Sequence, residues 1–254
     1  FQTIGNIIEL IEKDDIPKYL LFLENVFPYM DNYNYQKGMK EIIQELKNFL
    51  KPKDIGTDSD RALLLNFQAT LEIKPEKAIK LEKDALAQIE NITADNARLV
   101  SNLHANLGGL YRMNGHPDLA REHMEKSISL LDQFNLLHIN DSIPQIANYA
   151  MFLTEQQEPE RGISELQKLS GIIKEYHSDD CLDYAKVQET LGTIYLMTAN
   201  LPQAKTHFKR AFKIYEKIWA DEPEMIEAKY QEIQELYPQI GFCIGKNLSG
   251  LLTK

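Results

Sequence analysis

The chain has 254 residues, 43% of them hydrophobic, and is long enough to bury a core of its own. Its formal net charge is -10, from 28 Lys and Arg against 38 Asp and Glu. This balance disfavours a protein that neutralises phosphates, because nonspecific nucleic-acid affinity comes from Lys and Arg, so we expect no direct nucleic-acid partner.

Apolar residues at helical spacing predict an all-α chain made of helix pairs. In chain order we expect a partial N-terminal helix over 1–13, helix pairs over 16–50, 57–92, 97–134, 141–176 and 181–219, and closing helices over 223–254 that are interrupted at Pro238.

The pair over 97–134 illustrates the pattern. Leu103, Leu107 and Tyr111 form an apolar stripe of period 3.6, which is typical of a helix that faces a core. A break at Asn114-Gly115 follows, and then Pro117 stands where a second helix begins, a position at which its missing N–H costs nothing. The sequence therefore predicts two antiparallel helices joined by a short turn.

Small residues repeat at a fixed period. One set recurs every 42 residues, and three members of a second set stand twelve residues before it. Small side chains at fixed points let two helix backbones approach closely, beside bulky side chains that fill the groove. The first set is Ala78, Ala120, Gly162 and Ala204, and the second is Gly108, Ala150 and Gly192.

These marks resemble the tetratricopeptide repeat (TPR) signature, best in Leu191-Gly192, Tyr195, Ala204 and Phe208. The period of 42 resembles the longer repeats of kinesin light chain and of bacterial and plant signalling ATPases. The resemblance implies a right-handed superhelix, an α-solenoid that takes in residues 1–254 as a single domain. Asn66, where a small residue is expected, departs from the pattern.

The resemblance also implies that first helices line a concave surface. Asn106 and Asn148 lie 42 residues apart on the stripe next to the core stripe. An asparagine amide can hold both the C=O and the N–H of an extended peptide, so we predict a peptide groove here. Its predicted residues are Asn102, Asn106, Arg112, Met113, Asn148, Met151, Lys186 and Thr190. Ala105 and Ala147 stand where a chaperone-tail clamp would need a basic residue.

We therefore predict a non-catalytic scaffold that binds a protein or peptide, within a larger signalling or regulatory protein. The alternative is the peptide-pheromone-sensing domain of a bacterial transcription regulator whose helix-turn-helix precedes Phe1. The solenoid ends could also pair in a homodimer. The basic run from Lys205 to Lys217 is most simply a solvated convex face, although an acidic partner could dock there.

The sequence predicts no catalytic site, metal site or cofactor. The six histidines show no ligand spacing, and the segment Gly241 to Lys246 is one residue short of a phosphate-binding loop. Cys181 and Cys243 form no CxxC pattern, and no apolar run approaches the roughly 18 residues of a membrane span, so we expect a cytoplasmic protein. Asp179 and Asp180 are expected to cap the helix that follows them.

Overall fold

The computed structural model describes residues 57–138 and 142–236, and every regular element within these ranges is an α-helix. The predicted all-α class of paired helices is therefore confirmed. The chain divides into two compact units, Phe1–Phe134 and Asn135–Lys254, called unit 1 and unit 2 below. The elements predicted over 1–13, over 16–50 and beyond 236 lie outside the described residues, as does the segment Gly241 to Lys246.

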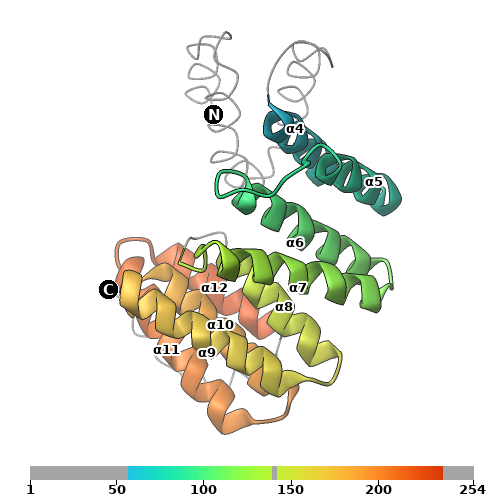
Figure 1. Cartoon of the computed structure of the whole chain (residues 1–254). Coiled ribbons are helices and arrows are strands. Elements are labelled where there is room, and N and C mark those ends of the chain that lie inside the picture. The colour runs from blue at the N-terminus through green and yellow to red at the C-terminus, as the bar shows by residue number, and fades with distance from the viewer. Residues whose placement is uncertain (1–56, 139–141, 237–254) are drawn as a thin grey trace. The chain divides into compact units, whose positions relative to one another are not determined.

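Unit 1 contains two described helix pairs. Helix α4 packs against α5, and α6 packs against α7, while α6 also contacts α4 and α5 (Figure 1). The second pair therefore stacks on the first through its leading helix. The bounds are Asp58–Thr70 for α4, Pro75–Leu86 for α5, Ala97–Met113 for α6 and Pro117–Gln133 for α7.

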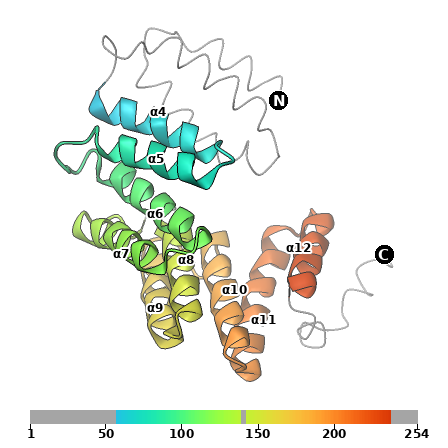
Figure 2. The same ribbon diagram turned by 90° about the vertical axis from the view of Figure 1, so that its right-hand side faces the viewer.

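The described part of unit 2 contains two further pairs and one additional helix. Helix α8 packs against α9 and α10 against α11; α10 also contacts both helices of the preceding pair, and α12 contacts α11 (Figure 2). The bounds are Ser142–Glu155 for α8, Pro159–Tyr176 for α9, Leu182–Met197 for α10, Leu201–Ile218 for α11 and Pro223–Leu236 for α12.

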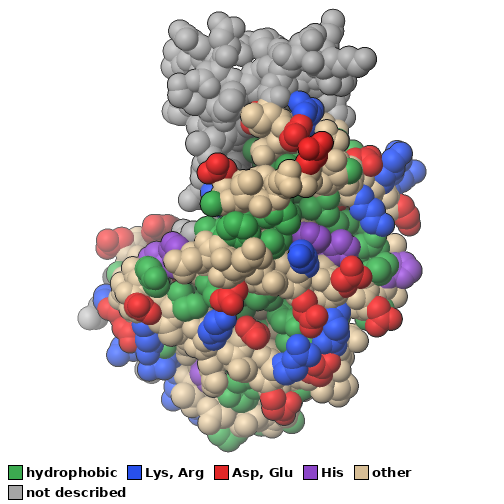
Figure 3. All heavy atoms as spheres, viewed as in Figure 1, with side chains coloured by type: hydrophobic (Ala, Val, Ile, Leu, Met, Phe, Trp, Pro, Cys, Tyr) green, Lys and Arg blue, Asp and Glu red, His purple; other side chains and the backbone are tan. Residues whose placement is uncertain are grey.

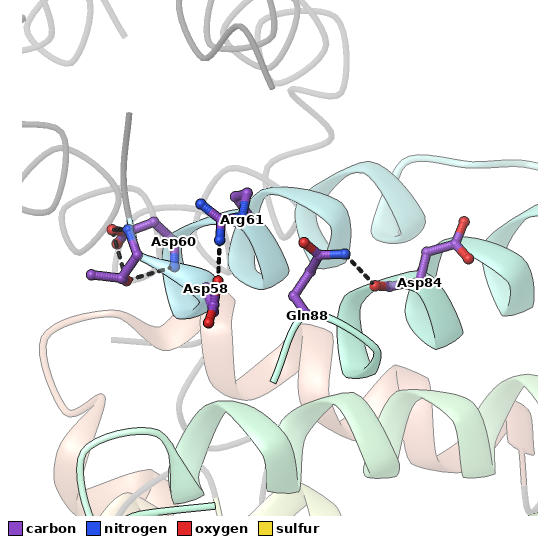
Figure 4. A network of polar contacts seen from close by, with 6 residues as sticks. Asp58, Asp60, Arg61, Asp84 and Gln88 are labelled. Carbon is purple, nitrogen blue, oxygen red and sulfur yellow. Dashed lines mark hydrogen bonds and ion pairs between the residues drawn. The ribbon is translucent and has the colours of Figure 1, made fainter. Parts of the chain in front are cut away.

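The helix starts follow local rules. At α4 the Thr57 hydroxyl accepts a hydrogen bond from the Asp60 N–H, and the Asp60 carboxylate accepts one from the Thr57 N–H, which is a complete capping box (Figure 4). Figure 4 also shows Arg61 beside Asp58 and the Gln88 amide donating to the Asp84 carbonyl. The bonds of Thr57, Asp60 and Gln88 satisfy backbone groups that an isolated helix end would leave open.

The predicted cap at the start of α10 is wrong. The Cys181 sulfur, rather than Asp179 or Asp180, accepts from the Tyr184 N–H at 3.4 Å. Asp180 instead forms an ion pair with Lys217 of α11. A thiol one residue later occupies the capping position, so the carboxylate is available to a different helix.

The turns between paired helices repeat to the level of single hydrogen bonds. Gly115, Gln157 and Ala199, spaced 42 residues apart, all have left-handed backbones, with φ of 75°, 66° and 59°. The next residue in each turn donates its N–H to a carbonyl five residues back: His116 to Tyr111, Glu158 to Leu153 and Asn200 to Tyr195. This is the Schellman ending of a helix, and only Gly115 meets its left-handed φ without a side-chain penalty.

The small residues bring paired helices close together. A Cβ added to Gly108 would lie 2.5 Å from the Met124 side chain, and one added to Gly192 would lie 2.9 Å from the Phe208 ring. A Cβ on Gly162 would lie 2.6 Å from the backbone oxygen of Ala150. Each distance is too short for a real contact, so these glycines set the helix spacing.

The bulky side chains between the helices are buried, among them Leu107, Leu131, Phe152 and Tyr184. Within the described ranges, no helix has both the length and the apolar character that a bilayer crossing requires.

Candidate functional site

The predicted groove residues of unit 2 lie on α8 and α10, which contact each other. Asn148 on α8 is exposed, and its amide makes no hydrogen bond with another described residue. Met151, one turn later, is half-buried. Both groups of the Asn148 amide are therefore available to a ligand, beside a thioether that adapts to irregular apolar surfaces.

On α10 the exposed Lys186 ammonium stands 3.9 Å from the Asp183 carboxylate, a distance at which an exposed ion pair contributes little. The Thr190 hydroxyl donates to the Lys186 carbonyl at 3.0 Å, which leaves the hydroxyl oxygen as an acceptor. Met197 ends the same stripe, 45% exposed. This face of unit 2 thus offers an amide, an ammonium and two methionine side chains.

Three of the predicted groove residues of unit 1 differ widely in exposure. Asn102 and Arg112 are half-buried, and both make polar or electrostatic interactions within the chain. Met113 is 81% exposed at the end of α6. In unit 1 the availability of a side chain therefore varies from one predicted groove residue to the next.

Asn106 has a structural role that the groove prediction did not include. Its Nδ2 donates to the Asn66 Oδ1 at 2.8 Å and to the Glu82 Oε1 at 3.1 Å. These two bonds use both amide hydrogens, so only the Oδ1 acceptor remains for a ligand. Asn106 thereby links α4 and α5 to α6.

Glu82 is the buried member of this cluster. The residue is 1% exposed, and its Oε2 has no hydrogen-bond partner. Burial raises the pKa of the Glu82 carboxyl to about 8, against the opposing effect of the Asn106 hydrogen bond. An acid in this position is neutral over much of the pH range in which a surface glutamate is charged.

The repeat period contained a signal that could have identified this cluster. Asn66 and Glu82 stand 42 residues before Gly108 and Met124, a glycine and a large apolar residue that face each other across a helix pair. The first described pair replaces that apolar contact with an amide and a carboxyl. Asn66 alone marks a departure from the repeat, and the cluster is recognised only when Asn66 is compared with the residue that faces it, Glu82.

Two histidines form a second titratable cluster in unit 1. His104 of α6 and His123 of α7 lie with their Nδ1 atoms 2.9 Å apart, and His123 stacks on Tyr111. Burial, then His123 and Lys126, lower the pKa of His104 to about 4. Burial also lowers the pKa of His123. A hydrogen bond between two imidazoles requires an unprotonated acceptor, which agrees with the lowered pKa of both histidines.

In unit 2 a polar network attaches α12. The Glu189 carboxylate accepts from the Tyr215 hydroxyl at 2.6 Å and pairs with Lys229 at 2.9 Å, and Lys229 also reaches Glu232 at 3.0 Å. Burial lowers the pKa of Lys229, but the two carboxylates outweigh it and raise that pKa overall. Glu189 therefore joins three helices.

The basic run lies on α11. Lys205, Lys209 and Lys213 are exposed, whereas Lys217 pairs with Asp180 and Arg210 lies over the Tyr184 ring, 5.8 Å from its centroid. Figure 3 shows that cationic and anionic side chains are interspersed on the face it presents. Among the residues that the structure describes, no three His, Cys, Asp or Glu side chains converge as metal ligands would.

Residues 142–217, which include α8, α9, α10 and all but the last residue of α11, match the family model described as tetratricopeptide repeat. A comparison with curated proteins finds no match.

Solved structures of low identity share the fold. BtubC (BKLC) from P. vanneervenii is 18% identical, with a TM-score of 0.59 over 72% of this chain and 72% of its own. A kinesin light chain of nearly identical TPR-like repeats from Podosopora anserina is 13% identical, with a TM-score of 0.59 over 77% of this chain and 96% of its own. A variant of that protein gives 0.61, at 13% identity, over 80% and 98%. At these identities the likeness concerns the fold of helical repeats.

Proposed function

Because this chain is a helical-repeat protein of the tetratricopeptide type, we propose that it is a non-catalytic scaffold whose concave groove of first helices holds a peptide or partner helix. The exposed Asn148 amide on α8 is the observation that supports this most directly, since it has no hydrogen-bond partner among the described residues. It lies on a helix that contacts α10, the helix of Lys186 and Thr190.

The chemistry of this face suits an extended peptide. An asparagine amide can donate to a peptide carbonyl and accept from a peptide N–H, so it recognises backbone regardless of side chains. Lys186 adds a cation for an acidic side chain or a C-terminus, and Met151 and Met197 add adaptable apolar contacts. The predicted ligand is therefore a peptide segment that carries at least one anionic group.

The experiment isolates partners from a native lysate with the purified chain, identifies them by mass spectrometry, and measures the affinity of the purified partner. The groove variant combines Asn148→Ala with Lys186→Glu. Asn106 is left intact because its loss would disturb Glu82 as well as any ligand. We expect the variant to bind at least tenfold more weakly, with an unchanged circular dichroism spectrum.

The matched control is Lys209→Glu with Lys213→Glu on the exposed face of α11. It changes charge by a larger amount on a different surface of the same unit. Equal loss of binding in both variants would indicate a general charge effect. Loss in the control alone would place the partner on α11 and contradict the groove.

A further inference from the structure

The cluster of Asn66, Glu82 and Asn106 connects three helices through one amide. Asn106 of α6 donates to Asn66 of α4 and to Glu82 of α5, at 2.8 and 3.1 Å. Apolar contacts between the helices of neighbouring repeats do not respond to pH. The packing of α6 on the first pair therefore includes a titratable group.

The environment of Glu82 strongly favours its neutral form. The side chain is 1% exposed, and Oε2 has no partner, so an ionised carboxylate would hold its charge on a single neutral hydrogen bond. Burying a charge without a countercharge is strongly unfavourable, and the protein avoids this by keeping the proton.

Among the described residues, no cation contributes to the pKa of Glu82. The described side chains that bond to it or to its partner from α4 and α6 are Asn66 and Asn106, which are uncharged amides. The adjacent cation on its own helix, Lys83, lies over the Tyr111 ring, 5.5 Å from the centroid. The pKa of Glu82 accordingly reflects burial, opposed by the Asn106 bond, with no contribution from a charged group.

We propose that Glu82 is a proton-controlled lock on unit 1, which holds α4, α5 and α6 together when protonated and loosens their packing when ionised. The effect of Glu82 on the packing of α4, α5 and α6 follows from this geometry and does not depend on the proposed function. Its consequence for ligand binding rests on the proposed function, since Asn106 belongs to the predicted groove and is oriented by the same bond. Raising the pH would then release the amide that a ligand meets in unit 1.

The direction of the pH dependence follows from the linkage between proton binding by Glu82 and the opening of unit 1. The pKa of Glu82 is raised from 4.5 to about 8 in the folded chain, so its stabilising contribution is complete below pH 4.5. Between pH 4.5 and about 8 the opened state ionises first, and the equilibrium constant for opening rises by up to tenfold per pH unit. Above that range the dependence disappears.

Hydrogen exchange of backbone amides tests the lock without any ligand. It is measured on the full chain by mass spectrometry from pH 5.5 to 8.5, with correction for the intrinsic exchange rate. We expect the protection of α4, α5 and α6 to fall with pH in the parent chain and to be nearly level in Glu82→Gln. Glu90→Gln, an exposed glutamate in the same unit, is the matched control and should behave as the parent.

A second variant, Glu82→Met, supplies the residue found 42 positions later at Met124 and should also give a level profile. The same pH dependence in the parent and in Glu82→Gln would overturn the proposal. So would a loss of α4 to α6 protection at every pH in both variants, because the acid would then be needed for structure and not for a response to protons.

Discussion

The first described helix pair of unit 1 and the last described helix pair of unit 2 use the same two facing positions for opposite chemistry. In the α10–α11 pair, Gly192 faces Phe208, and a Cβ on the glycine would lie 2.9 Å from the ring. In the α4–α5 pair, the corresponding residues are Asn66 and Glu82. An apolar ring, that of Phe208, fills the space between α10 and α11. In the α4–α5 pair this position holds the Glu82 carboxyl, which accepts a hydrogen bond from the Asn106 amide of α6.

The turns of these two pairs differ as well. Ala199 between α10 and α11 has a left-handed backbone, whereas Ile73, at the same place in the period, has no positive φ and is 85% exposed. The α4–α5 pair thus departs from the repeat at its turn and at its central contact. Repeat geometry tolerates these departures because each helix pair also packs on a neighbouring pair of its own unit.

Phe208→Glu tests this comparison most severely, because it gives unit 2 the acid of unit 1 without the amides that support it. The facing residue is Gly192, which offers no side-chain donor. We expect a loss of about 4 kcal/mol or more in the free energy of unfolding, from the lost ring and the buried carboxyl. Urea denaturation followed by Trp219 fluorescence reports unit 2, since the chain has a single tryptophan.

The control for this variant is Phe208→Leu, which supplies the residue found 42 positions earlier at Leu166 and should cost less than about 1.5 kcal/mol. Should Phe208→Glu cost no more than the leucine variant, the helix pairs would accept an acid at this position without support, and the contrast with Glu82 would have no energetic basis.

Gly162→Ala tests the close approach of α8 and α9. The other pairs have Ala78, Ala120 and Ala204 at this position, but here a Cβ would lie 2.6 Å from the Ala150 carbonyl oxygen. A backbone atom cannot move aside as a side chain can, so we expect a loss of about 2–3 kcal/mol. The same denaturation measurement applies.

Gly171→Ala on the same helix is the matched control, because a Cβ there meets nothing within 4 Å. Alanine favours helix over glycine, so this change should stabilise unit 2 by about 0.5–1 kcal/mol. Equal effects at the two glycines would contradict the role assigned to Gly162.

His104→Gln tests the second titratable cluster. Unit 2 has Gln188 at the corresponding position, where its carbonyl oxygen lies 2.9 Å from the Nδ1 of His207. The pKa of His104 is lowered from 6.5 to about 4, so its contribution is present above pH 6.5 and is lost as the pH falls towards 4. Allowing for partial exposure, the parent should lose about 1–2 kcal/mol more than the variant over this range.

The measurement is hydrogen exchange of α6 and α7 at pH 7.0, 5.5 and 4.5, with the exposed His116→Gln as the control. Glu82 changes stability in the opposite direction over part of the same range, so each profile is compared with that of the parent. A parent and variant that lose protection equally on acidification would show that the histidine pair does not titrate as described.

The helix pairs, their period and their close contacts were predictable because each depends on residues near in sequence. Leu107 and Tyr111 define one apolar face, and Pro117 marks the next helix start. The surface position of Asn148 followed from the same stripe. Local periodicity therefore determined most of the fold and part of the candidate site.

The second role of Asn106 was not predictable in this way. Its partners are 40 and 24 residues distant, and whether an amide faces solvent or a buried acid depends on side chains from two other helices. The prediction that Asp179 and Asp180 cap α10 failed for a smaller reason, since the helix begins one residue later than the acidic pair suggests. Contacts between repeats, and single-residue shifts at helix ends, lie beyond a periodic pattern.

Ala199→Gly examines the smallest difference between the units, which is the residue that carries the left-handed turn. Unit 1 has Gly115 with φ of 75°, whereas unit 2 has Ala199 with φ of 59°. A left-handed alanine costs about 1–2 kcal/mol, part of which glycine loses again through the entropy of its unfolded chain. We expect a net gain of about 0.5 kcal/mol in unit 2 by Trp219 fluorescence, and a loss of about 1 kcal/mol for Gly115→Ala in unit 1 by hydrogen exchange of α6 and α7. Effects of the same sign at both positions would mean that the 42-residue period does not impose a common backbone on its turns, despite the matching hydrogen bonds of His116 and Asn200.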